Sequence, residues 1–199
     1  LHQEGFPFVL VGCREIDGAE LSYVAANYAA ATAEVVEHLA AAGHTRMLFI
    51  GNMHRLEAAL HRETGFRGAH QRLGLPLDEA RICRIPPDVV TGPWLQSWLD
   101  VGVTAFVAEE TAHTICLLAA ARQLGRRIPD DFSLAALGNP TSSNEAIPGL
   151  TTFHIPRQEM GAEAVLLLAR MLEQPAAAAP FRATLTWTIV PGQTVAPPR

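Results

Sequence analysis

Short apolar segments of strand length alternate along this chain with longer segments of helical character. Met47–Gly51 and Ala105–Ala108 are uninterrupted apolar runs, the kind that form strands buried on both faces. The helical segment after each run stops at a glycine, Gly74 and Gly125, and glycine commonly follows the last residue of a helix. Strands that alternate with helices of this length predict a parallel sheet covered on both faces, so the expected fold class is α/β.

The same patterns predict elements over most of the chain. Strands are expected at 8–12, 47–51, 81–85, 105–108, 134–137, 151–155 and 183–190, and helices at 25–42, 57–73, 93–99, 111–124 and 157–172. A polar loop is expected over 138–149 and an Ala/Pro linker over 175–180.

The composition limits the classes of function. The chain of 199 residues carries a net charge of −5, and all 15 basic residues are Arg, so an acidic balance argues against a nucleic-acid surface within it. Cys13, Cys83 and Cys116 form no close pair, which favours reduced thiols. No apolar stretch reaches membrane-spanning length. We therefore expect a cytoplasmic protein with no membrane partner.

Candidate ligand-binding residues follow three of the predicted strands. In open α/β sheets, ligands bind beyond the carboxyl ends of the strands, where the next helices begin. His54 lies in the loop after the strand 47–51, and Glu110 follows the strand 105–108. Gly138 and Asn139 follow the strand 134–137. These four residues are expected at a ligand site.

Arg62 is the most informative single residue of the predicted helix 57–73. It shares one stripe of that helix with Phe66 and Leu73. A charged group at the end of an apolar stripe is costly to desolvate unless it finds an anionic or hydroxyl-rich partner, which makes Arg62 a ligand-binding candidate. The alternative is an ion pair with Glu57 or Glu63, or a solvated first turn.

Five segments of the chain carry a resemblance to a known family. They read GHTRMLFIG at 43–51, RETGF at 62–66, RRIPDDFS at 126–133, PGLTT at 148–152 and PRQEMG at 156–161. In this order and spacing, they resemble the effector-binding domain of the LacI/GalR family of bacterial transcription regulators. In that family, the Arg of the segment matching 62–66 commonly grips the effector.

The resemblance implies a two-lobed periplasmic-binding-protein-like fold with parallel sheets. Residues 1–42 and 144–172 would belong to an incomplete N-terminal lobe, and residues 43–143 and 173–199 to the C-terminal lobe. It implies a sensor of a small-molecule effector bound between the lobes, without a cofactor. The sensor would modulate binding to operator DNA by a helix-turn-helix that this chain lacks, and it would act as a homodimer.

The chain departs from the family at two strand ends. Glu110-Thr111 stands where relatives have an Asn-Asp pair, and Gly138-Asn139 stands where they have an Asp-Asp pair. The loss of these sugar-binding groups argues against a standard pyranose, whereas Arg62 favours an acidic or polyhydroxy ligand such as a sugar acid. In an alternative arrangement, Glu110 pairs with Arg62 and leaves an uncharged pocket.

Two other classes of protein remain open from the sequence: a solute-binding protein of a transport system, and a small α/β enzyme. No phosphate loop, nucleophile elbow or zinc-protease motif is present, and no catalytic residue is assigned. His113 and Cys116 share a helix face but lack a second pair of ligands, so no metal site is expected. A helix-turn-helix or a secretory leader encoded upstream would separate regulator from transporter.

Overall fold

The computed structural model describes residues 6–12, 18–54, 56–138, 149–174 and 180–199. The chain divides into two compact units. The first unit comprises Leu1–Asn27 and Ile155–Trp187, and the second comprises Tyr28–His154 and Thr188–Arg199. The lobe bounds expected from the resemblance, 1–42 with 144–172 and 43–143 with 173–199, stay a prediction.

The elements of the two units are as follows. The first unit contains β1 (Leu10–Val11), β2 (Tyr23–Ala26), α6 (Arg157–Glu173) and β8 (Arg182–Leu185). The helices of the second unit are α1 (Tyr28–Ala41), α2 (Glu57–Arg72), α3 (Gly92–Asp100) and α4 (Thr111–Gln123), with the short 3-10 helices η1 (Glu79–Arg81) and η2 (Pro87–Val89). Its strands are β3 (Met47–Gly51), β4 (Ile82–Arg84), β5 (Ala105–Ala108), β6 (Ser133–Ala136), β7 (Thr152–His154) and β9 (Thr188–Val190).

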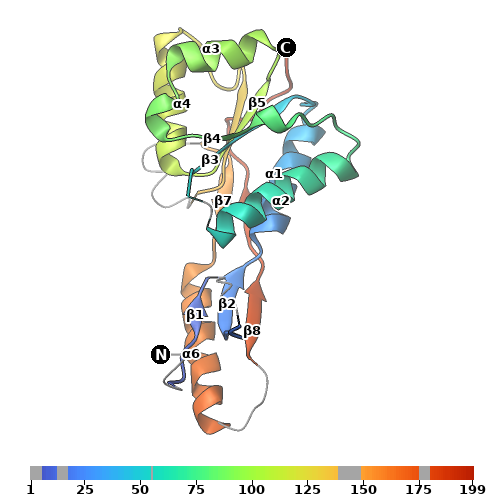
Figure 1. The fold of residues 1–199 in the computed structure, drawn as a ribbon. Coiled ribbons are helices and arrows are strands. Elements are labelled where there is room, and N and C mark those ends of the chain that lie inside the picture. Colours follow the sequence, from blue (N-terminus) through green and yellow to red (C-terminus); the bar gives the residue numbers. More distant parts are fainter. Residues whose placement is uncertain (1–5, 13–17, 55, 139–148, 175–179) are drawn as a thin grey trace. The chain divides into compact units, whose positions relative to one another are not determined.

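A parallel sheet with strand order β4-β3-β5-β6 forms the centre of the second unit. On one face, Leu48, Phe106 and Leu134 pack in a single cluster with Leu95 of α3 and Leu117 of α4. The opposite face is covered by α1 and α2 (Figure 1). Every residue of β3, β5 and β6 is buried, so the expected parallel α/β sheet with two covered faces is confirmed.

Residues 23–26 and 182–190 are the places where the expected elements were wrong. The helix expected to begin at residue 25 begins at Tyr28, because Tyr23–Ala26 form β2 between β1 and β8. The strand expected over 183–190 is divided: β8 pairs parallel to β2 in the first unit, whereas β9 pairs antiparallel to β7 in the second. Helix α6 lies along the three-stranded sheet of the first unit (Figure 1).

Helices α1 and α2 touch backbone to backbone at Gly65. A Cβ atom at Gly65 would overlap the carbonyl group of Ala29, so only glycine allows α2 to lie this close to α1. Phe66, the next residue, packs its ring on Phe49 of β3 with the two centroids 5.5 Å apart. The glycine in the RETGF segment thus sets the distance between α1 and α2, while the phenylalanine anchors α2 on the sheet.

We expect Gly65→Ala to lower the free energy of unfolding by at least about 1–3 kcal/mol, because the new methyl group must push α1 away from α2. Gly68→Ala is the matched control on the same helix. Its Cβ would meet only the Arg72 side chain, at 3.5 Å, and Ala in a helix is favoured over Gly by roughly 0.5–1 kcal/mol. Urea denaturation of both variants tests this, and equal effects would contradict it.

His44 joins the amino ends of the central strands to the C-terminal segment. Its Nδ1 lies 2.9 Å from Thr104 Oγ1, and its Nε2 lies 2.9 Å from both Ser133 Oγ and the Ala196 carbonyl oxygen. The ring is buried. Burial lowers the pKa of His44 below its ordinary value, and the hydrogen bond to the Ala196 carbonyl only partly offsets this. The folded unit therefore favours the neutral imidazole.

The lowered pKa of His44 predicts a loss of stability in mild acid. Below the ordinary value of 6.5 the unfolded chain binds a proton that the folded chain does not, so the free energy of unfolding falls as pH drops from 7.5 to 5.5. The slope contributed by one such group is at most about 1.4 kcal/mol per pH unit. His44→Gln should reduce this slope, and His70, whose pKa burial also lowers, should retain the remainder. An unchanged slope in urea titrations would contradict the assignment.

Candidate functional site

Arg62 on α2 reaches the carboxyl end of β5. Its Nη1 donates to Glu109 Oε1 over 2.9 Å, and its Cζ lies 4.6 Å from the ring centroid of Tyr28, the first residue of α1. The side chains of Arg62 and Glu109 are 15% and 4% exposed, so water screens this ion pair only weakly. The ion pair and the ring together hold the guanidinium in one position.

Glu109 uses both carboxylate oxygens within the fold. Oε1 accepts from Arg62, and Oε2 accepts from the backbone N–H of Asn52, 3.0 Å away. A Cβ atom at Gly51 would lie 2.8 Å from the same Oε2, so the glycine that ends β3 leaves room for this carboxylate. Glu109 therefore ties α2 and β5 to the end of β3.

Asn52 holds the neighbouring carboxylate. Its Nδ2 donates to Glu110 Oε1 over 2.8 Å, and its Oδ1 accepts from the backbone N–H of His54 over 3.2 Å. These two contacts identify which end of the Asn52 amide is the nitrogen and which is the oxygen. Glu110 precedes the first turn of α4 and remains half-buried. We call Tyr28, Asn52, Arg62, Glu109 and Glu110 the polar edge.

The polar edge carries one more negative charge than positive, because it contains two carboxylates and a single guanidinium. An anion bound by Arg62 would compete with Glu109, whose side chain is 4% exposed, for the charge of the guanidinium. Breaking a buried pair by removing one partner costs on the order of 3–5 kcal/mol, since the remaining charge is left without compensation. This arrangement argues against the sugar acid that the sequence favoured.

The structure does not bring all of the residues expected at the ligand site together. Arg62 and Glu110 belong to the polar edge, while His54 is exposed and reaches Asn52 through its backbone N–H. Gly138 instead accepts a hydrogen bond from Thr152 Oγ1, 3.1 Å away, and so joins β7. Asn139 lies outside the described residues. The ion-pair partner of Arg62 is Glu109, and neither Glu63 nor Glu110.

Strand alternation explains the partner of Arg62. Phe49 pairs with Val107 across β3 and β5, and Phe49 faces α2 through Phe66. Side chains two residues apart point to the same face of a sheet, so Glu109 continues the face of Val107, toward Arg62. Glu110, one residue later, continues the opposite face. This signal is readable once the pairing of the strands is known.

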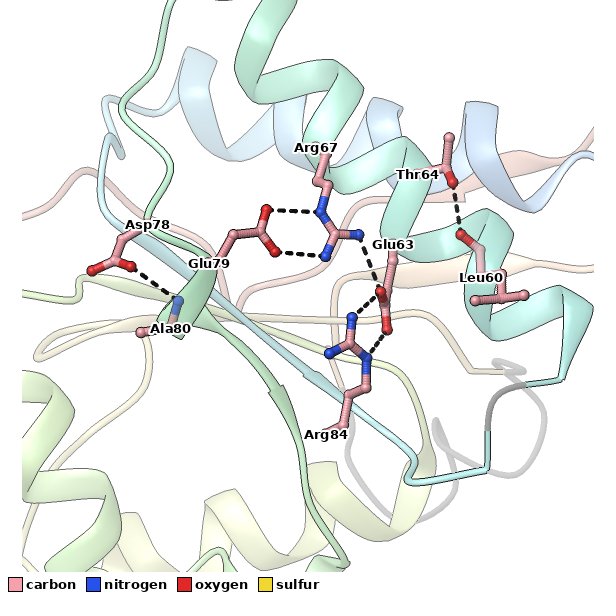
Figure 2. A network of polar contacts seen from close by, with 8 residues as sticks. All are labelled: Leu60, Glu63, Thr64, Arg67, Asp78, Glu79, Ala80 and Arg84. Carbon is pink, nitrogen blue, oxygen red and sulfur yellow. Dashed lines mark hydrogen bonds and ion pairs between the residues drawn. The ribbon is translucent and has the colours of Figure 1, made fainter.

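A second ion-pair network fixes the middle of α2 (Figure 2). Glu63, 4% exposed, accepts hydrogen bonds from Arg67 and Arg84, and Arg67 also forms a two-point contact with Glu79, at 2.9 and 2.7 Å. Burial alone would raise the pKa of Glu63, but the hydrogen bonds from Arg84 and Arg67 outweigh it, and the pKa lies below its ordinary value. The network joins α2 to β4 and η1, so Glu63 is not available to Arg62.

His113, Cys116 and Cys83 have places in the fold that do not favour metal binding or thiolate chemistry. His113 Nε2 lies 2.9 Å from the Ile85 carbonyl oxygen, and Cys116 packs against the apolar cluster of α3 and α4. Burial raises the pKa of the Cys83 thiol to about 11, which disfavours the reactive thiolate. Within the described ranges, no three His, Cys, Asp or Glu side chains gather as metal ligands.

No helix in the described part of the chain is both long enough and apolar enough to cross a membrane.

Residues 36–195 match the family described as periplasmic binding protein-like domain. The chain belongs to this family. Among curated proteins, it is 33% identical over 132 residues to the HTH-type transcriptional regulator DegA of Bacillus subtilis (strain 168). That alignment covers 65% of this chain and 39% of the regulator, so the chain spans less than half of that relative's length.

Solved structures give the same result. A putative LacI transcriptional regulator from Bacillus cereus subsp. cytotoxis NVH 391-98 is 26% identical, with a TM-score of 0.79 over 97% of this chain and 69% of that one. A LacI-family regulator from Enterococcus faecium with bound ribose is 20% identical and supports the fold alone, with a TM-score of 0.82 over 99% and 73%. The predicted resemblance and fold class are confirmed, and the named relatives are transcription regulators rather than enzymes.

The two carboxylates of the polar edge should differ in their effect on stability. We expect Glu109→Gln to lower the free energy of unfolding by about 3–5 kcal/mol, because it leaves the buried guanidinium of Arg62 without a counter-charge and replaces one of the two accepting oxygens with a donor. Glu110→Gln keeps an oxygen for Asn52 and should stay within about 0.5 kcal/mol of the wild type. Thermal and urea denaturation of the two variants measure the difference. Equal losses would contradict the assignment of Glu109 as the buried partner.

Proposed function

We propose that this chain is the effector-sensing part of a bacterial transcription regulator. A small, polar, hydroxyl-rich ligand binds at the polar edge, and its binding changes the affinity of the whole protein for operator DNA. The DNA is read by a helix-turn-helix in a part of the protein outside this chain, and the protein works as a homodimer in the cytoplasm. The polar edge, at the carboxyl ends of β3 and β5, is the observation that carries this proposal.

Three observations support this proposal. Carboxyl ends of parallel strands are where α/β sheets bind ligands, and the polar edge gathers hydrogen-bonding groups there. The family match covers residues 36–195, and relatives bear the names of transcription regulators. The fold neighbour with bound ribose shows that this architecture accommodates a sugar in that protein. A sugar is therefore the ligand class to test first.

The ligand acts through its preference for one of two conformations. A ligand shifts such an equilibrium only by its difference in affinity for the two states. A shift from 1:99 to 99:1 needs about 5.5 kcal/mol of difference, so several polar contacts must change together. One charge-assisted contact, such as that of Arg62, contributes about 1.5–3 kcal/mol. The joined carboxylates, amide and guanidinium of the polar edge provide several such contacts at once.

A thermal-shift screen with sugars, amino sugars, sugar acids and purines tests the ligand-binding part. A ligand present at 100 times its Kd stabilises the folded chain by about 2.7 kcal/mol, which raises its melting temperature. The upstream coding sequence tests the proposed role in transcription. A helix-turn-helix encoded there supports a regulator, and a secretory leader supports a transport protein. Turnover of any ligand found would support an enzyme instead.

Arg62→Lys should weaken the binding of the ligand found in the screen by at least about tenfold, which is 1.4 kcal/mol. The ammonium can still pair with Glu109, so folding persists, but the planar fork of donors is lost. Arg72→Lys is the matched control on the same helix, since Arg72 pairs with Glu37 on the exposed surface. Calorimetry that finds wild-type affinity in Arg62→Lys would remove Arg62 from the site.

A further inference from the structure

The outer face of α4 is exposed and yet apolar. Among Asp, Glu, Lys and Arg, the helix contains only Arg122, in its last turn. Its exposed residues before that point are Ala112, Ile115 and Ala119, and Ile115 is 49% exposed. Spacings of three and four place these side chains on one stripe. Because a helix that is apolar on all sides is normally buried, this stripe is the kind of surface that another surface covers.

The segment that contains η2 widens the apolar surface. His113 Nε2 lies 2.9 Å from the Ile85 carbonyl oxygen, and a Cβ atom at Gly92 would lie 3.3 Å from Gln123 Oε1. Residues 85–92 therefore run alongside α4 from its first turn to its last. On this segment, the side chain of Val89 is 40% exposed. We define the α4 stripe as Val89, Ala112, Ile115 and Ala119.

The order of side chains on α4 suits a second copy of the same helix. Ala112 and Ala119, both small, lie three and four positions from Ile115, the large residue between them. Two antiparallel copies would place Ala112 of each beside Ala119 of the partner subunit, with both Ile115 side chains near the two-fold axis. A two-fold interface requires such a self-complementary surface. Small residues on both sides of the axis also let the two helices approach closely.

The charges at the two ends of α4 favour the same orientation. Glu110 precedes the first residue of α4, and Arg122 is exposed in its last turn. Within the described ranges, Arg122 forms no ion pair. An antiparallel copy brings ends of opposite charge together, whereas a parallel copy brings like charges together. Complementary charges at the edge of an interface set the orientation of the partners more than their affinity.

We propose that the α4 stripe binds the α4 stripe of a second copy of this chain, with the two helices antiparallel about an axis near Ile115. This inference rests on the proposed function, which includes a homodimer, and it names the surface that forms it. The stripe belongs to the side of the central sheet that α3 and α4 cover, opposite α1 and α2 (Figure 1). Since α4 begins directly after Glu110, one helix connects the polar edge to this interface.

The association of the whole chain is measured by sedimentation velocity and light scattering. Ile115→Asp should raise the dissociation constant of the dimer at least about 30-fold, as expected for a side chain at the centre of an interface. Leu73→Asp is the matched control, because Leu73 is 43% exposed at the end of α2, on the opposite side of the sheet. It should leave the dissociation constant unchanged. Circular dichroism and the melting temperature confirm that both variants fold.

Disulfide cross-linking tests the orientation without a destabilising charge. A disulfide forms only where the two Cβ atoms lie about 3.5–4.5 Å apart. A mixture of Ala112→Cys and Ala119→Cys chains should therefore cross-link more than either variant alone. Ile115→Cys should cross-link with itself, and Leu73→Cys should form no more covalent dimer than the unchanged chain with its own cysteines.

The outcomes separate the surface from the homodimer and from the sensor. Helix α6 also exposes apolar side chains, among them Val165 at 67%, so Val165→Asp is the competing variant. Dissociation by Val165→Asp and not by Ile115→Asp would overturn the α4 stripe and leave the homodimer standing. Cross-linking of Ala112→Cys mainly with itself would overturn the antiparallel orientation. An unchanged chain that stays monomeric at high micromolar concentration would overturn the second copy, while the thermal-shift screen would still decide the sensor.

Discussion

The ion pair between Arg62 and Glu109 is the interaction on which the arrangement of the polar edge depends. It joins the first half of α2 to the residue that follows β5, and the second oxygen of Glu109 binds the backbone of Asn52 beyond β3. Because both charges are largely buried, each needs the other to remain in the fold. Glu109 fixes the position of the Arg62 guanidinium and also neutralises its positive charge.

The charged side chains of α2 take part in two separate polar networks. Glu63 and Arg67 take part in a network with Glu79 and Arg84 that pins the helix to β4 and η1. Arg62, directly before Glu63 in the chain, turns toward Glu109 instead. Arg67 and Arg84 are paired within this network, so their positive charges do not offset the excess negative charge of the polar edge.

Most of the second unit was predictable because its strands are buried on both faces. Met47–Gly51 and Ala105–Ala108 were predicted with their observed bounds, since an unbroken apolar run between turns has few other uses. Tyr23–Ala26 was missed because it runs into the Ala-rich α1 without a strong breaker. The alternating pattern over 183–190 indicates which side chains are buried, but it does not indicate which strand lies alongside. The sequence therefore could not predict that this segment divides into β8 and β9. Glu109 required the pairing of Phe49 with Val107, which no local pattern contains.

The missing side chain at Gly65 has a consequence for how this surface can evolve. The carbonyl of Ala29 rests where a Cβ would stand, and Ala29 follows Tyr28, whose ring lies over Arg62. The distance between the Tyr28 ring and the Arg62 guanidinium is therefore set by how closely α1 and α2 cross. Changes that loosen this crossing would move the ring relative to the guanidinium without replacing either side chain.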